Sequence, residues 1–408
     1  MTNNPQFQRP SFQIKGRKSP LAITAIILVA IGVLFTALSG FYADWLWFKS
    51  VNFTNTWSTI LTTKATLFVV SGLLTSVIVM LNVLLAYKRR PLYVPMTVEA
   101  DNLERYRAQV EPIRRPLVIG LSVALFYFAG TAGSQMWSTW LLFKNSTPFG
   151  VTDPQFNMDI SFFAFRLPFW QTLISWGIST AILAILASVA VHYLYGGIRL
   201  QVQEDRTTVA ARVQLSVLLG LVVLLKAVAY WFDRYALALK ESRLITGLTY
   251  TDVNAVLPAK AILAGIAIVC SLLFFANIVR RSWVLPAAGT ALLVVSSVLI
   301  AGLYPGAIQQ FQVKPSESSK EAPFIQRNID ATRAAYGIDD VNIKDYQATV
   351  ATNTGQLADD AATIANIRLM DPNVLSEPLD NFSRFVLITA SQSHWILIVT
   401  QSMASSAM

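Results

Sequence analysis

Seven long apolar runs dominate this sequence, and each has about the length that an α-helix needs to cross a lipid bilayer. A hydrocarbon core of about 30 Å is spanned by about 20 helical residues. Backbone amides in lipid must be satisfied within their own segment, so each run is predicted to be helical. The predicted spans are Leu21–Ala43, Thr66–Tyr87, Pro116–Ser134, Phe169–Tyr195, Val213–Phe232, Ala261–Val279 and Trp283–Tyr304.

The composition also indicates lipid as the solvent. Charged residues make up 13% of the chain, whereas about 25% of the residues in soluble domains are charged. The first run is longer than the apolar region of a cleaved signal peptide, and the aromatic belt Phe41–Phe48 follows it, so a permanent helix is predicted. The predicted fold class is all-α: a polytopic membrane bundle of seven spans with a short, mostly helical extracytoplasmic C-terminal segment.

Lysine and arginine are distributed unevenly among the connectors, and this bias predicts the orientation. The N-terminal tail and the even-numbered connectors hold more than twice as many as the odd-numbered connectors. The N-terminus is therefore predicted to be cytoplasmic and the C-terminus extracytoplasmic, in a bacterial cell membrane. The net charge of +9 reflects the same bias and attraction to anionic lipid. The expected partners are the lipid bilayer and envelope or membrane proteins, and not nucleic acid.

Several connectors carry local signals. Val98–Val110 mixes acids, arginines and apolar residues, which predicts a short cytoplasmic helix lying on the membrane. Ile160–Phe165 is apolar but too short to cross, so an interfacial segment is predicted. Phe232–Pro258 is predicted to extend the fifth span and then turn at Gly247. The short link between the last two spans is little more than Arg280-Arg281, which predicts a tight antiparallel hairpin.

The chain becomes polar after Tyr304, and three prolines predict an extended linker there. They are Pro305, Pro315 and Pro323. A helix is predicted over Phe324–Tyr336, ended by Gly337, and a second over Gln356–Arg368.

Small residues one helical turn apart are the pairs Ala129/Gly133 and Ala261/Gly265. Such pairs let helix backbones approach closely, although chance in alanine-rich helices explains them equally well.

Acidic residues are absent from all seven predicted spans. Ion-coupled carriers commonly place ionisable groups at membrane depth, so this absence argues against that class. Lys226 is the one cation well inside a predicted span. Three interpretations are open: its amine snorkels to the outer surface, which we favour, it pairs with an external carboxylate such as Asp233, or it lines a substrate path.

The predicted outer loops concentrate carboxylates and tryptophans. They are Asp153, Asp159, Asp252, Glu317 and Glu321, with Trp137, Trp140 and Trp170. An external cation or sugar site is one interpretation, and a solvated surface at the membrane interface is the favoured one.

Motifs for nucleotide binding, hydrolysis and metal binding are absent from the sequence. The lone Cys270 excludes a disulfide within the chain, and His192, with no second histidine or carboxylate beside it, is predicted to be interfacial. Neither a cofactor, a metal site nor an enzymatic activity is expected.

Motifs near the predicted outer face resemble an uncharacterised family of large bacterial multi-pass membrane proteins. They are Tyr42–Phe48, Phe149–Phe156, Asp159–Phe163, Leu167–Phe169, Tyr304-Pro305, Gln310–Pro315, Glu321–Ile329 and Arg368–Pro372. The resemblance covers about residues 20–380. It implies seven N-terminal spans followed by a long extracytoplasmic region, with no established activity and no catalytic residues to carry over.

The resemblance stops near Phe382, although family members continue for hundreds of residues. Codons that fit His394–Gln401, regrouped one base upstream, spell a segment expected in the family, so a frameshift near residue 382 is predicted. The predicted organisation is a cytoplasmic tail (1–20), a seven-helix transmembrane domain (21–304), an incomplete extracytoplasmic segment (305–382) and a non-native tail (383–408).

The favoured function is an integral plasma-membrane protein of unknown biochemistry that serves as a platform for an envelope-facing region. The alternative is a channel or transporter subunit, with a water-filled path lined by Lys226, Asn82 and hydroxyl side chains.

Overall fold

The computed structural model describes residues 20–91, 98–199, 206–242, 245–280 and 284–345. The chain divides into two compact units, Met1–Asp339 and Asp340–Met408, and every helix that the structure describes lies in the first. The described residues of this unit are helical, with isolated bridges but no strand. Seven of the helical stretches are long and apolar enough to cross a membrane, which confirms the predicted fold class. The predicted domain boundaries stay predictions.

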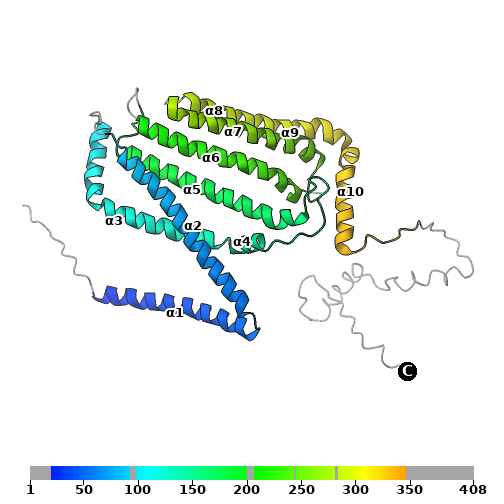
Figure 1. The fold of residues 1–408 in the computed structure, drawn as a ribbon, viewed down its shortest axis with the longest axis horizontal. Coiled ribbons are helices and arrows are strands. Elements are labelled where there is room, and N and C mark those ends of the chain that lie inside the picture. The colour runs from blue at the N-terminus through cyan, green and yellow to red at the C-terminus, as the bar shows by residue number, and fades with distance from the viewer. Residues whose placement is uncertain (1–19, 92–97, 200–205, 243–244, 281–283, 346–408) are drawn as a thin grey trace, which may run out of the picture. The chain divides into compact units, whose positions relative to one another are not determined.

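Ten α-helices run through these residues (Figure 1). They are α1 (Pro20–Ser50), α2 (Thr54–Lys88), α3 (Val98–Ser134), α4 (Trp137–Lys144), α5 (Leu167–Leu194), α6 (Val209–Ala236), α7 (Leu257–Arg280), α8 (Val284–Ser296), α9 (Tyr304–Ala307) and α10 (Glu317–Tyr336). In Figure 1, α5, α6 and α7 lie side by side, and α1 extends away from them, joined to α2 by a tight turn. Phe41 and Trp57 contact edge to face across that turn, with centroids 4.9 Å apart.

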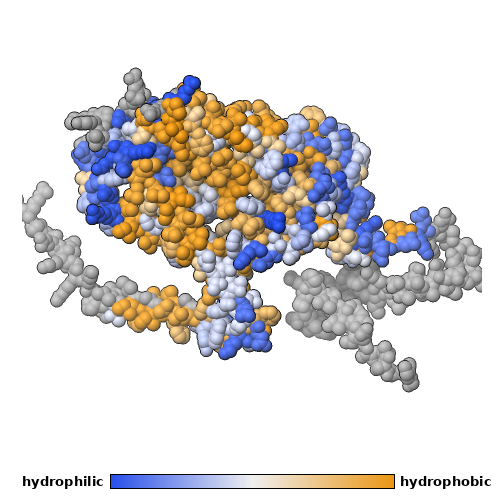
Figure 2. All heavy atoms as spheres, viewed as in Figure 1, coloured by the Kyte–Doolittle hydropathy of each residue, from blue (hydrophilic) through white to orange (hydrophobic). Residues whose placement is uncertain are grey.

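The lateral surface of the bundle is apolar. Figure 2 shows an orange band over the helices, with hydrophilic residues gathered at the ends of the bundle. Large apolar side chains on the spanning helices, such as Leu81 of α2 and Leu186 of α5, are each 60% exposed. A water-soluble monomer rarely exposes a contiguous apolar patch of this extent, so the surface fits lipid.

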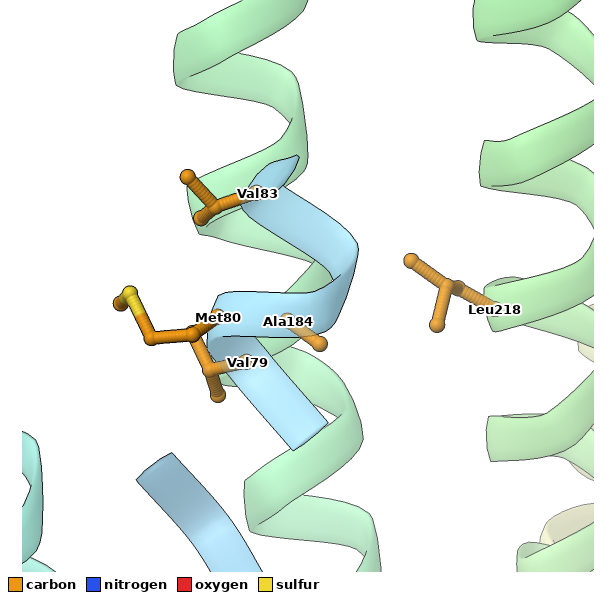
Figure 3. Packing of buried hydrophobic residues seen from close by; sticks show 5 residues of the cluster. All are labelled: Val79, Met80, Val83, Ala184 and Leu218. Atoms are coloured by element: carbon orange, nitrogen blue, oxygen red, sulfur yellow. The ribbon is translucent and has the colours of Figure 1, made fainter. Parts of the chain in front are cut away.

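Buried apolar side chains join α2, α5 and α6 at the centre. Val79, Met80 and Val83 of α2 form one cluster with Ala184 of α5 and Leu218 of α6 (Figure 3). Because lipid tails are as apolar as leucine, such contacts hold helices together mainly through close packing.

The pair Ala129/Gly133 packs against α2, which decides between the two open interpretations in favour of close packing. The Ser71 hydroxyl donates to the Ala129 carbonyl at 3.0 Å, and a Cβ added to Gly133 would collide with the Ser71 side chain. The pair Ala261/Gly265 does not mark such a contact, because a Cβ on Gly265 would meet nothing within 4 Å. The hairpin of the last two spans is confirmed by the Cys270 thiol, which donates to the Gly289 carbonyl at 3.2 Å.

Proline residues follow every π-helical segment in the described part of the chain. The four segments are Phe162–Arg166, Asp252–Val256, Ser297–Leu303 and Ile308–Val313, and the prolines are Pro168, Pro258, Pro305 and Pro315. A proline inside an α-helix lacks the N–H for its bond and clashes with the carbonyl four residues earlier. Widening the preceding turn to π geometry accommodates that clash without ending the helix.

This geometry corrects two predictions. Ile160–Phe165 is not a separate interfacial segment, because Phe162–Arg166 is the first turn of the helix that continues as α5. The extended linker after Tyr304 is also wrong: residues 304–336 are helical throughout, as α9, a π segment, a 3₁₀ turn (Lys314–Ser316) and α10. The chain turns sharply before α10 (Figure 1), so the long helix does not continue straight.

The structure corrects a third prediction in α3. Val98–Val110 is not a separate short helix but the first part of α3, which continues to Ser134 with Pro112 and Pro116 in its interior. Figure 1 shows α3 bent into two arms, as interior prolines lead one to expect.

The remaining connector predictions divide into confirmed and untested ones. α6 is extended by the 3₁₀ turn Leu237–Leu239, and Gly247 has a φ of 109°, as the predicted turn requires. Gly337 ends α10 with a left-handed φ of 62°, which confirms the predicted cap. The second predicted helix, over 356–368, and the tail over 383–408 lie outside the described residues.

Candidate functional site

Asp159 closes the loop that leads from α4 to α5. Its carboxylate accepts the backbone N–H groups of Phe149 at 3.1 Å, Gly150 at 2.9 Å and Ser161 at 2.8 Å. These bonds, with one from the Ser161 side chain, hold the pKa of Asp159 well below its usual value. Every donor belongs to the same loop, so the carboxylate fixes local structure rather than facing a ligand.

Asp153 fixes the other half of that loop. It accepts the N–H groups of Gln155 at 2.9 Å and Phe156 at 2.7 Å, which is the geometry of an Asx turn. Asn157 follows with a positive φ of 53°. The carboxylates of Asp153 and Asp159 therefore both hold the backbone of one loop in place.

Asp252 is the most buried carboxylate of the loop between α6 and α7, with 1% of its surface exposed. The Lys240 ammonium donates to it at 2.8 Å and the Thr249 hydroxyl at 2.8 Å. Glu321 of α10 accepts the N–H of Tyr250 from the same loop at 3.0 Å. Both carboxylates bond to groups of the protein itself.

Lys226 lies over the ring of Tyr230, with its ammonium 4.8 Å from the ring centroid. Tyr230 is one turn further along α6, so the side chain leans toward the C-terminal end of that helix. Asp233, the suggested carboxylate partner, lies 3.4 Å from the ammonium of Lys260 instead. The two predicted site residues of α6 are therefore not brought together as a pair.

Histidine, cysteine and carboxylate side chains form no group of three suited to a metal ion within the described ranges. Of the predicted site residues, Asp153 and Asp159 share the loop before α5, and Lys226 and Asp233 share α6. The structure shows no bond between the two pairs in the described residues.

A buried polar cluster around Gln214 of α6 is the feature that the sequence prediction missed. The Gln214 amide oxygen lies 3.0 Å from Nε2 of His192 on α5. Its amide nitrogen donates to the Asn82 carbonyl of α2 at 2.9 Å and to the Ser188 hydroxyl at 3.2 Å. His192 is 1% exposed, so other residues rather than solvent surround it, and its interfacial position in the membrane stays a prediction. The cluster ties three helices together.

Further hydrogen bonds between neighbouring helices extend this cluster, and we call the whole set of buried polar contacts the polar seam. Thr75 of α2 bonds Thr180 of α5 at 3.3 Å. The Asn277 amide of α7 donates to the Ser216 hydroxyl of α6 at 2.6 Å. Ser, Asn, Gln and His side chains between helices stabilise membrane bundles in this way. The signal was present in the sequence as uncharged polar residues inside apolar runs.

An open groove of about 540 Å³ lies between α2, α4 and the start of α5. Its walls include Leu67, Trp140, Phe169 and Trp176. The indole N–H of Trp176 is buried and without a hydrogen-bond partner in the part of the chain that the structure describes. The groove is mainly apolar, as ligand-binding grooves commonly are.

Fold, surface and interior define a multi-pass membrane protein: seven apolar helices of spanning length, an apolar lateral surface and a polar seam inside. The chain belongs to the uncharacterised protein family UPF0182, whose model matches residues 21–384. That match confirms the family resemblance, and it ends close to Phe382, where the motifs of the family stop. The frameshift itself stays a prediction.

Curated relatives carry the family name alone. The chain is similar to the UPF0182 protein of Streptomyces coelicolor, with 45% identity over 90% of this chain and 37% of that protein. The UPF0182 protein of Frankia casuarinae is 43% identical over 90% of this chain and 36% of its own. The chain thus spans little more than a third of the curated relatives that it matches. No solved structure matches it.

Proposed function

We propose that this chain is a membrane platform that holds an envelope-facing region in place, and that it is neither an enzyme nor a carrier. The observation that carries the proposal is the seating of α10. This helix packs on the loops that precede α5 and α7, and it leads into the residues after the last span.

Four contacts seat α10, and they come from two different loops. The Glu321 carboxylate accepts the Tyr250 N–H. The Asn328 amide donates to the Thr246 carbonyl at 2.7 Å, and the Arg327 guanidinium donates to the Gln155 side chain at 3.3 Å. The Lys320 ammonium also lies 4.8 Å from the Tyr250 ring centroid.

Contacts of this kind fix the position of α10 and do not take part in a chemical reaction. Glu321 is 9% exposed, and its carboxylate accepts a backbone N–H of the loop before α7, so it holds α10 against that loop. The loops themselves are fixed by Asp153, Asp159 and Asp252. We call the two fixed loops, before α5 and before α7, the collar. Because α10 packs on the collar, this arrangement supports the role of a platform for the region into which α10 leads.

The interior supports the same proposal. The polar groups that a conducting path would use, among them Asn82 and Gln214, bond to one another across the helix interfaces. The Lys226 ammonium lies over the ring of Tyr230, which belongs to the same helix. A carrier subunit stays the alternative, and it requires these groups to exchange their partners for water or a solute.

The test has a topological and a functional arm. Single cysteines placed at Tyr336 and at Arg115 in a Cys270→Ser background are labelled in intact cells with a membrane-impermeant maleimide. We expect labelling at residue 336 and none at residue 115 until the cells are opened. The reverse pattern contradicts the platform, because α10 then faces the cytoplasm.

The functional arm compares the purified chain with its Lys226→Ala variant in liposomes loaded with ions and small solutes. We expect no protein-dependent flux from either. A flux that disappears in the Lys226→Ala variant, while Lys260→Ala retains it, refutes the platform and establishes the transporter alternative.

A further inference from the structure

A basic pocket of about 390 Å³ lies at the end of the bundle opposite α10. It is formed where α2 and α5 end and by the first arm of α3. Arg90, Glu104, Arg107, Glu111 and Tyr195 line it. These residues come from the connectors rich in lysine and arginine, which are predicted to face the cytoplasm.

Glu111 is fully engaged within this pocket. Its carboxylate accepts the hydroxyl groups of Tyr87 and Tyr195, each at 2.8 Å. Arg114 donates to it at 2.9 Å, and Arg90 lies 3.8 Å away. The negative charge of Glu111 is therefore shared among four groups, and it leaves the arginines of the pocket only partly neutralised.

Arg107 is held in one orientation by the neighbouring helix. Its Nε donates to the Leu194 carbonyl at the C-terminal end of α5 at 2.6 Å, and the guanidinium lies 5.9 Å from the Tyr195 ring centroid. Its Nη2 is buried and has no hydrogen-bond partner among the described residues. Arg107 as a whole is only half-buried, but a guanidinium nitrogen that is removed from water without an acceptor of its own is destabilising.

The remaining charges favour an anion. Two arginines and two carboxylates line the pocket, and Arg114 adds a third positive charge by bonding Glu111 from outside the lining, so arginines outnumber carboxylates around the pocket. The planar fork of arginine matches the oxygens of phosphate. Arg90 follows the end of α2 and Arg107 lies on α3, so the two side chains come from different segments. Basic pockets between transmembrane helices on the cytoplasmic side commonly hold lipid phosphates.

We propose that this pocket binds a phosphate group through Arg90 and Arg107, carried by an anionic lipid headgroup or by a free phosphate. The phosphate joins the end of α2 to the first arm of α3 and offsets the buried charge of Arg107. The site lies at the end opposite the α10 collar, and its test does not depend on the platform role.

The experiment measures thermal unfolding of the purified full chain in neutral detergent, followed by tryptophan fluorescence at constant ionic strength. Phosphatidylglycerol, phosphatidylcholine and inorganic phosphate are titrated separately. We expect phosphatidylglycerol to raise the midpoint temperature and phosphatidylcholine to leave it unchanged. In Arg107→Gln and in the more exposed Arg90→Gln, half-saturation requires roughly tenfold more phosphatidylglycerol.

Two further variants separate a site from general attraction. Arg115→Gln removes the same charge from the same arm of α3 but lies outside the pocket lining, so it titrates like the wild type. Glu104→Gln removes a repelling carboxylate and shifts half-saturation to less lipid. If Arg107→Gln does not fold, the opposite shifts of Arg90→Gln and Glu104→Gln carry the test.

The titrations also identify the source of the phosphate. A shift produced by inorganic phosphate with the same dependence on Arg90 and Arg107 assigns the site to free phosphate, and a shift confined to phosphatidylglycerol assigns it to lipid. The proposal is overturned if phosphatidylglycerol stabilises Arg90→Gln and Arg107→Gln as much as Arg115→Gln. It is equally overturned if neither phosphate source stabilises the wild type.

Discussion

Replacing Gln214 by leucine tests whether the polar seam stabilises the bundle. The variant keeps a side chain of similar volume but removes the acceptor 3.0 Å from His192 and the donor 2.9 Å from the Asn82 carbonyl. Hydrogen bonds between membrane helices contribute about 0.6 kcal/mol each on average, so these two account for roughly 1.2 kcal/mol.

The larger cost falls on His192, because its ring nitrogen then has no partner at 1% exposure. A buried polar group left unsatisfied costs about 1–3 kcal/mol. The expected loss in the free energy of unfolding is therefore about 2–4 kcal/mol. Leucine at Gln109, an exposed position of α3, is the matched control and is expected to change little.

The measurement is reversible unfolding in mixed micelles of a mild detergent and SDS, followed by circular dichroism. The double variant Gln214→Leu/His192→Leu removes both partners, so it should cost less than the sum of the two single variants by about 1 kcal/mol or more. The reasoning is refuted if Gln214→Leu matches the Gln109→Leu control, or if the two single effects simply add.

Three other perturbations are expected to act locally. Gly133→Leu drives a side chain into α2 and should lower the free energy of unfolding by about 1–3 kcal/mol in the same assay. Gly120→Leu, with open space around it, should not lower it. Equal effects of the two substitutions contradict the packing of Gly133 on α2. Glu321→Ala leaves the Tyr250 N–H without its acceptor, so trypsin should cleave α10 faster, and unchanged cleavage argues against the seating of that helix. The lowered pKa of Asp159 means that its contribution to stability is present above the unfolded value near 3.8 and is lost as the pH falls through the lower folded value. Hydrogen exchange of the loop over 149–161 should therefore accelerate only in strong acid, and Asp159→Asn should abolish that pH dependence; a transition at neutral pH contradicts the assignment.

The number and approximate position of the spans follow from the sequence because hydrophobic length is a strong constraint in lipid. The helix ends do not follow from it. α2 begins at Thr54, twelve residues before the predicted Thr66, because polar residues at the rim of a membrane continue a helix without being apolar. Hydropathy locates the lipid-facing centre of a helix and not its ends.

The candidate site was harder to predict for a different reason. Asp153 and Asp159 are satisfied by N–H groups within ten residues, yet a carboxylate in a loop looks the same whether it meets a backbone or a ligand. The Gln214 cluster joins residues 22 and 132 positions apart, and no local spacing encodes such a pairing. Polar residues inside apolar runs point to a buried network, but only the packing of α2, α5 and α6 identifies the partners.

The prolines explain the remaining errors, and they also explain how the collar is built. A proline read as a helix breaker predicts an extended linker after Tyr304, but the helix continues there through a widened turn, as it does before α5. One extra residue in a helix rotates the residues before it by about 100° relative to the residues after it. That rotation accompanies the burial of Phe163 before α5 and of Asp252 before α7, which are 4% and 1% exposed. Both residues lie in π-helical segments that precede a proline, and Asp252 bonds Lys240 and Thr249 of the loop on which α10 packs.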